Sequence, residues 1–132
     1  MTIFGAIGVA GSGMTVYRKW LDAISDNLSN VSTVRRTDEA AYQAKYVVAQ
    51  SIDTGDGGVA VAGIARGSAV GRLVYEPGNP LADDEGYVRY PDIDMSSQMT
   101  QLIMAQRGYQ ANAAVVERAR EAYTAALQIG RG

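Results

Sequence analysis

Few residues of this chain could perform chemistry, because its 132 residues include no cysteine and no histidine. Their absence excludes thiol nucleophiles, disulfides, Cys/His zinc sites and imidazole acid–base catalysis. The segment Gly8–Thr15 is one residue away from a phosphate-binding loop. However, Met14 stands where that loop needs a lysine, and no strand precedes the segment. We therefore expect no nucleotide site there.

Acidic residues gather at two places, Asp83-Asp84-Glu85 and Asp92 with Asp94. A calcium site needs about six oxygen ligands converging from a defined loop, and neither group has that spacing. We interpret the first group as a solvated turn and the second as a helix cap. Paired carboxylates for glycoside hydrolysis would need a concave framework, which no pattern indicates. The sequence predicts no enzyme, no catalytic residue, no metal ligand and no cofactor.

Five tyrosines fall in segments with strand character: Tyr42, Tyr46, Tyr75, Tyr87 and Tyr90. Such rings can bind glycans or peptides, but they more often cover a small sheet and keep their hydroxyls in water. We favour the second interpretation.

An apolar seam dominates the N-terminal segment. It advances in alternating steps of four and three through Ile3, Ile7, Ala10, Met14, Tyr17, Leu21, Ile24, Leu28 and Val31. This heptad pattern predicts a helix over 3–31, about 42 Å long at 1.5 Å per residue, with one stripe facing a partner helix. Gly5, Gly8 and Gly11 each weaken it by about 1 kcal/mol. We expect this end to order on packing, and the glycines could admit a close neighbouring helix.

A second long helix is predicted from Met95 to about Ile129, with Asp92 or Asp94 as its cap. Its seam follows Met95, Met99, Leu102, Gln106, Tyr109, Ala113, Val116, Arg120, Tyr123 and Leu127. Both helices also carry apolar residues away from these seams, for example Val9 and Trp20 on the first and Ile103 and Val115 on the second. One helix pair cannot bury all of them, so we expect further helical neighbours.

The middle of the chain has short strand patterns separated by turns. Tyr42, Ala44, Tyr46, Val48 and Ile52 alternate and predict a strand over 42–52 with these residues on its half-buried face. A glycine- and aspartate-rich turn at 53–58 leads to a returning strand at 59–64. Further strands are expected at 70–76 and 87–90.

These elements predict an α+β, mainly α, fold in which the terminal helices pair as an antiparallel coiled coil around a small β-hairpin region. We divide the chain into an N-terminal coiled-coil helix (1–34), a β-rich middle (35–92) and a C-terminal coiled-coil helix (93–132) that pairs with 1–34.

The distribution of charge indicates which partners and which targeting segments the chain lacks. The net charge of −2 argues against nucleic acid held by phosphate neutralisation. The first basic residue, Arg18, follows the apolar run, whereas a cleaved signal needs basic residues before it. The same run contains four glycines up to Gly13, which does not suit a membrane span.

Three motifs resemble those of the bacterial flagellar axial proteins, the family of rod and hook subunits. The segment Ser25–Thr33 is similar to the family pattern S-x-N-[LI]-A-N-x-x-T, with Ser29 in place of the usual alanine. The segment Leu73–Asp83, with Gly86-Tyr87-Val88 after it, resembles the stretch before the last helix of a short rod protein. The segment Ala105–Asn112 resembles A-x-R-x-Y-x-A-N, with Gly108 in place of the usual serine or alanine, which we expect to loosen the helix locally.

The resemblance covers nearly the whole chain, and the short length favours the proximal rod over the distal rod and hook. It implies a structural subunit that polymerises through its terminal helices into the torque-transmitting drive shaft. It also implies export through the flagellar type III apparatus without a cleaved signal, and assembly in the periplasm. The implied partners are other copies of the chain, the rod proteins FlgB, FlgF, FlgG and FliE, and the export apparatus, with no nucleic acid and no small-molecule substrate. Within this family, the rod protein FlgB is the alternative assignment for the chain itself.

We expect the subunit interface to include Ile7, Met14, Leu21, Ile24, Asn27, Leu28, Asn30, Val31, Leu102, Arg107, Tyr109, Asn112, Val116, Tyr123 and Leu127. Among them, Asn27, Asn30, Arg107 and Asn112 are the polar residues of the matched motifs, and we expect them to hydrogen-bond helix ends or neighbouring subunits. The alternative function is a soluble helical-hairpin adaptor that binds another partner, which predicts a well-folded monomer.

Overall fold

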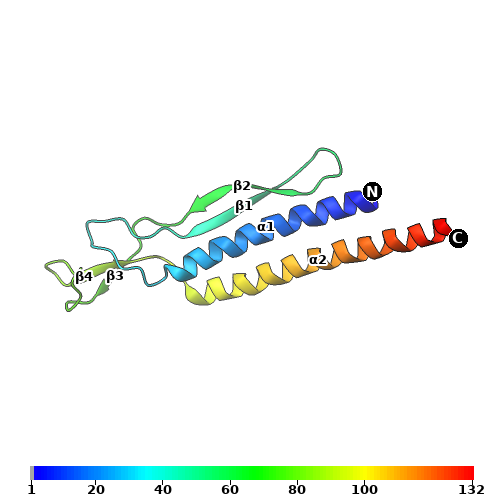
Figure 1. Cartoon of the computed structure of the whole chain (residues 1–132). Coiled ribbons are helices and arrows are strands. Elements are labelled where there is room, and N and C mark those ends of the chain that lie inside the picture. Colours follow the sequence, from blue (N-terminus) through cyan, green and yellow to red (C-terminus); the bar gives the residue numbers. More distant parts are fainter. Residues whose placement is uncertain (1) are drawn as a thin grey trace. The chain divides into compact units, whose positions relative to one another are not determined.

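The computed structural model describes residues 2–132, so Met1 of the predicted N-terminal region lies outside the described residues. Two long helices, α1 (Ile3–Ser29) and α2 (Met95–Arg131), flank four short strands (Figure 1). The predicted mainly helical α+β fold with paired antiparallel terminal helices is confirmed. The Asp94 carboxylate accepts a hydrogen bond from the Ser97 amide at 3.0 Å, so Asp94 caps α2 as expected.

The chain divides into two compact units. In the first unit, the described residues are 2–21, Val47–Gly63 and Ile103–Gly132; the second comprises Asp22–Tyr46 and Ile64–Leu102. Each unit draws on both helices and on the segment between them. The domain boundaries after 34 and 92 stay a prediction.

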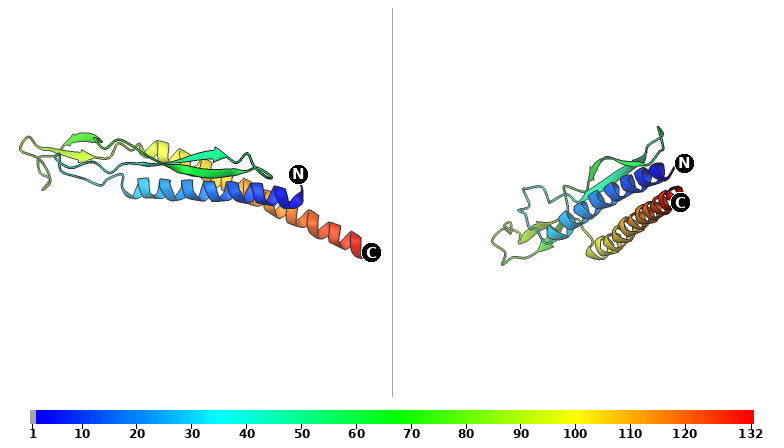
Figure 2. Two further views of the ribbon diagram at one scale, coloured as in Figure 1. Left: turned by 90° about the horizontal axis from the view of Figure 1, so that it is seen from above. Right: turned by 45° about the vertical axis from the view of Figure 1, so that its right-hand side comes forward.

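In the first unit the helices lie antiparallel in a defined register. The Phe4 and Tyr123 rings meet edge to face at 5.3 Å between centroids, and Gly13 and Gly108 of the two helices lie against Asn112 and Tyr17 respectively. These contacts match residue i of α1 to a residue near 125 − i of α2. Because α1 begins at Ile3, α2 continues beyond it at the C-terminal end (Figure 2). Every residue from Arg120 to Gly132 is exposed.

A hairpin covers another side of α1 in the first unit. Strand β1 (Lys45–Ser51) pairs with β2 (Val59–Arg66), and the amide of Ile52 donates to the Gly58 carbonyl at 2.9 Å to close the end. Gly55, Gly57 and Gly58 have positive φ in the predicted turn, a conformation that favours glycine. Ser12 of α1 anchors the hairpin, because its hydroxyl accepts from the Val59 amide at 3.1 Å and donates to the Val9 carbonyl at 2.6 Å.

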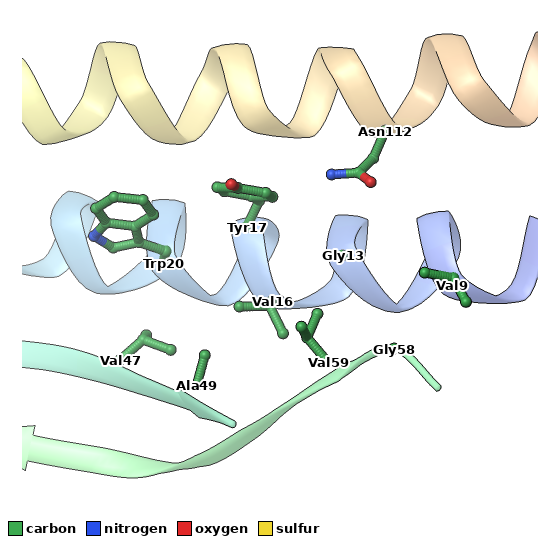
Figure 3. Close-up of a pocket in the computed structure, with 10 residues that line it drawn as sticks. All are labelled: Val9, Gly13, Val16, Tyr17, Trp20, Val47, Ala49, Gly58, Val59 and Asn112. Atoms are coloured by element: carbon green, nitrogen blue, oxygen red, sulfur yellow. The ribbon is translucent and has the colours of Figure 1, made fainter. Parts of the chain in front are cut away.

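The half-buried face predicted for the strand at 42–52 is wrong beyond Ala44. Tyr46, Val48 and Ile52 are 39%, 46% and 36% exposed. The opposite face, with half-buried Val47, turns toward α1 (Figure 3). Both faces of the strand carry apolar residues, so alternation alone could not decide which one packs inward.

The second unit contains the largest of the fully buried side chains. Strand β3 (Arg72–Tyr75) pairs antiparallel with β4 (Tyr87–Tyr90), with Val74 opposite Val88, and Arg35 forms an isolated bridge to Arg89. Ile24, Val88, Asn27 and Pro91 are the largest fully buried side chains. The predicted third strand therefore pairs with the fourth in a hairpin of its own.

The covered face of α2 differs from the predicted seam in one of its two rows. The first row was predicted and consists of Leu102, Tyr109, Val116 and Tyr123. The second row was not predicted and consists of Gln98, Ala105, Asn112 and Ala119. We call these eight residues the inner seam. The predicted members Met95, Met99 and Leu127 are 52%, 46% and 50% exposed. Small and amide side chains fill this row because the helices approach closely, whereas a search for apolar periodicity selects the bulkier residues one position later.

Candidate subunit interface

Asn27 sits at the centre of the second unit and is 1% exposed. Its carboxamide oxygen accepts from the Lys45 amide at 2.7 Å, and its Nδ2 donates to the Lys45 carbonyl at 2.9 Å and to Gln98 Oε1 at 3.1 Å. Gln98 is 2% exposed. One side chain thus joins α1 to the first residue of β1 and to α2, which fixes the register of the helices.

Asn30 follows the last turn of α1. Its Nδ2 donates to the Asp26 carbonyl at 2.8 Å, and its Oδ1 accepts from the Thr33 hydroxyl at 3.0 Å. The Asp26 carbonyl also accepts from the Asn30 backbone amide at 3.2 Å, so the side chain adds a second donor to the last turn of the helix. The expectation that motif asparagines hydrogen-bond a helix end is met at this residue.

Asn112 and Gly108 mark the closest approach of the helices in the first unit. Asn112 Nδ2 donates to the Gly108 carbonyl at 3.0 Å, and its amide lies over Gly13. A Cβ at Gly108 would lie 2.3 Å from a carbon of the Tyr17 ring. Helix α2 is continuous through Gly108, so this departure from the family pattern makes room for Tyr17.

We predict that Gly108→Ala destabilises the isolated chain by about 1 kcal/mol. Alanine gains about 1 kcal/mol in helix propensity, but crowding the Tyr17 ring costs about 1–3 kcal/mol. Urea unfolding measures the difference. In a Tyr17→Ala background the same substitution should stabilise the chain, since the ring is gone. Equal effects in both backgrounds would contradict the packing argument.

The glycines at the start of α1 differ in their surroundings. A Cβ at Gly5 would lie 3.0 Å from the Asp56 carboxylate, whereas nothing lies within 4 Å of one at Gly8 or Gly11. Within residues 2–132, no element of the chain itself approaches these two positions closely.

We predict that Gly8→Ala stabilises the isolated chain by about 1 kcal/mol, the difference in helix propensity. Gly13→Ala is the matched control, because its Cβ would lie 2.9 Å from the Asn112 amide, and it should stabilise less or destabilise. Thermal or urea unfolding of both variants decides. A loss of stability in Gly8→Ala equal to that of Gly13→Ala would contradict this description of α1.

The predicted interface residues divide by exposure. Ile24 and Asn27 are buried within the chain, so they support its own fold. Arg107, Tyr123 and Leu127 are exposed. The remaining ten are half-buried: Ile7, Met14, Leu21, Leu28, Asn30, Val31, Leu102, Tyr109, Asn112 and Val116.

Val115, which the sequence analysis named only as an apolar residue away from the predicted seam, belongs to a second apolar stripe on α2. This stripe advances in unbroken steps of four and three through Met104, Gly108, Ala111, Val115, Arg118, Ala122, Ala125 and Ile129. We call it the outer seam. All of its members except half-buried Gly108 are exposed, with Met104, Val115 and Ile129 at 56%, 47% and 82%. The heptad spacing of this stripe is visible in the sequence. However, four of its residues are small and one is Arg118, so its apolar pattern is weaker than that of the predicted seam, whose residues are larger.

An apolar groove of about 480 Å³ lies between α1 and the β1–β2 hairpin in the first unit (Figure 3). Along α1 it is lined by Val9, Gly13, Val16, Tyr17 and Trp20, and from the hairpin by Val47, Ala49, Gly58 and Val59. Asn112 of α2 completes the lining. None of these residues is charged.

The acidic turn has a structural role. Asp83 accepts from the amides of Tyr87 at 2.9 Å and Glu85 at 3.0 Å and from the Thr37 hydroxyl at 3.0 Å. The Tyr87 amide is the largest cause holding the pKa of Asp83 below its ordinary value. Among the described residues no acidic cluster is arranged to hold a metal ion. The segment Gly8–Thr15 lies inside α1, so it forms no phosphate loop.

In residues 2–132, neither α1 nor α2 has an apolar stretch long enough to cross a membrane.

Comparison with known proteins gives matches along the whole chain. A family model described as "Flagellar basal body rod FlgEFG protein C-terminal" matches residues 84–129, which include the outer seam. The chain is 37% identical to the flagellar basal-body rod protein FlgC of Escherichia coli O157:H7 over 134 residues, covering 99% of this chain and 100% of that protein. It is 37% identical to FlgC of Salmonella typhimurium over 135 residues and 31% identical to FlgC of Bacillus subtilis over 150 residues, each match covering 99% of this chain and 100% of the relative.

Proposed function

The chain belongs to the family of flagellar basal-body rod proteins FlgC, and from that premise we propose that its outer seam is the surface through which it polymerises. As a member of this family it is a structural rod subunit located in the flagellar basal body. The matched relatives are named as rod proteins, which does not favour the adaptor alternative.

The observation that carries the proposal is the exposure of the outer seam. A helix of an isolated soluble protein normally turns one apolar stripe inward and a polar face outward. Helix α2 has two heptad stripes. Among the described residues, the inner seam is covered except for exposed Tyr123, and the outer seam is exposed except for half-buried Gly108. A stripe with heptad spacing is the surface that a further helix packs against. Helices of neighbouring subunits would supply that cover in a rod.

The proposal refines the predicted interface. The inner seam includes Leu102, Tyr109 and Val116, which are half-buried within the chain, so we propose that they act on assembly by holding the helix pair. The exposed residues Tyr123 and Leu127 can contact neighbouring subunits directly. When a surface on one side of a subunit meets a different surface on the next one, and the rotation between them does not close a ring, the result is an open helical array. Such an array, with many buried helix contacts, suits a shaft that transmits torque.

The specific partners are part of the proposal. Assembly with other flagellar rod components follows from the family. We propose that these components are other copies of this chain together with FlgB, FlgF, FlgG and FliE, and that the type III export apparatus delivers the chain to the periplasmic proximal rod.

The test uses the absence of cysteine from the chain. A Val115→Cys variant is expressed in cells lacking the native chain, and basal bodies are isolated and treated with maleimide. We expect Val115→Cys to be protected from maleimide in basal bodies and labelled by it in the free chain. Free labelling in basal bodies would contradict the proposal. Absence of the chain from basal bodies would favour the adaptor alternative.

A further inference from the structure

Within residues 2–132, little of the chain covers the end of α2. Residues 120–132 are all exposed, and Leu127 and Ile129 expose 50% and 82% of their surface. The register of the helices explains this, because α1 begins opposite residue 122 or so and leaves the rest of α2 without a partner helix. Phe4, itself 66% exposed, meets only Tyr123 of this segment by an aromatic contact.

Most of this end of α2 is also uncharged. Residues 122–130 contain no acidic or basic side chain, and the flanking residues Glu121 and Arg131 are the first charges on either side. Helix ends in water usually carry charged residues that keep them soluble, whereas an uncharged apolar end suits a buried position. We call residues 122–130 the C-terminal segment.

The groove described above has the complementary properties. Its lining is uncharged and mostly valine, alanine and aromatic rings, and it follows α1 from Val9 to Trp20, about 17 Å at 1.5 Å per residue. The C-terminal segment is about 13 Å long by the same rise. The groove is therefore long enough for the segment and offers no charge that the segment would leave without a partner.

We infer that the C-terminal segment of α2 docks into the groove between α1 and the β1–β2 hairpin of a second copy of this chain. This inference rests on the proposed function and names one of its contacts. The donor segment and the groove are different surfaces of one molecule, so the contact is head-to-tail and can repeat from copy to copy without closing. Residue 59 of one copy then lies near residues 123–129 of the next.

Disulfide formation in isolated basal bodies tests the inference. Val59→Cys is combined in turn with Tyr123→Cys, Leu127→Cys or Ile129→Cys, and the particles are treated with a mild oxidant. At least one pair should give products at twice the chain's mass and above, because a disulfide requires Cα atoms about 4.4–6.8 Å apart. Each single-cysteine variant should remain at the mass of one chain. Glu85→Cys with Leu127→Cys is the matched control, since exposed Glu85 lies in the polar turn, and it should also give no product.

Two results would overturn the inference: no product from any of the three pairs, or residue 59 joined to a different protein as identified by mass spectrometry. If Val115→Cys stays protected in the same basal bodies, the proposed function stands and only the docking contact fails. Ala49→Trp gives a second measurement, because Ala49 is exposed and lines the groove. It should leave the free chain folded and reduce the oxidised product at least about tenfold, and an unchanged yield would contradict the docking.

Discussion

Val115→Glu is expected to abolish rod assembly and swimming while leaving the isolated chain folded. Val115 lies in the middle of the outer seam and is 47% exposed in the isolated chain. There the glutamate side chain stays in water, and a surface substitution of this kind changes the free energy of unfolding by about 0.5 kcal/mol or less. In the assembled rod the same carboxylate would be enclosed between helices, where an unpaired charge costs several kcal/mol. A cost of about 3 kcal/mol already weakens a contact about a hundredfold.

The measurement is the diameter of the swimming zone in soft agar together with a count of rods in isolated basal bodies. Gln110→Glu is the matched control, because Gln110 is exposed on α2, lies off the outer seam and gains the same charge. It should swim like the unaltered strain. Normal swimming by Val115→Glu, or equal defects in both variants, would contradict the assignment of the outer seam as an interface.

Asn27→Leu is expected to destabilise the isolated chain by about 3 kcal/mol or more. Leucine has a similar size, but it leaves the Lys45 amide, the Lys45 carbonyl and Gln98 Oε1 without their partner. Each buried polar group left unpaired costs about 1–3 kcal/mol. The loss should appear as a lower urea midpoint and, in cells, as fewer rods.

Asn30→Leu is the comparison for this prediction, since Asn30 bonds the Asp26 carbonyl in an exposed part of the same motif. Water can replace that bond, so we expect a loss of about 1 kcal/mol. The two asparagines would then differ in role although they lie three residues apart in one signature. An equal loss of unfolding free energy in both variants would contradict the claim that the bonds of Asn27 to β1 and α2 are the source of its contribution to stability.

The two long helices were predictable because heptad spacing over many residues is a strong signal. The first seam was predicted almost completely, since every member from Ile3 to Val31 is at least half-buried. Its success follows from the position of α1, which has α2 on one side and the hairpin on another. When a helix is covered on several sides, a predicted stripe falls on a covered face even if its direction is slightly wrong.

The orientation of α2 and of the first strand was less predictable for a shared reason. Both elements carry apolar residues on two faces, and the sequence does not state which face stays inside the chain. On α2 the close contact uses Ala105, Gly108 and Asn112, which a hydrophobic pattern ranks below Met99 and Leu127. On the strand, Val47 faces α1 (Figure 3), whereas Val48 is 46% exposed. In the sequence alone, apolar residues that the fold leaves exposed cannot be distinguished from core residues.

The polar contacts of the candidate interface depended on tertiary structure. The motif containing Asn27 was recognised, but its partners are far away in sequence, at Lys45 and Gln98. The room that Gly108 gives Tyr17 likewise requires the register of the helix pair. Neither relation could be derived from local spacing.

Imaging the assembled rod at a resolution that shows side chains is the most direct test of the central claim that the outer seam is an interface. The account predicts that Met104, Val115 and Ile129, which expose 56%, 47% and 82% of their surface in the single chain, become nearly fully buried against helices of neighbouring subunits. A rod in which these three side chains face solvent or an open channel would contradict it.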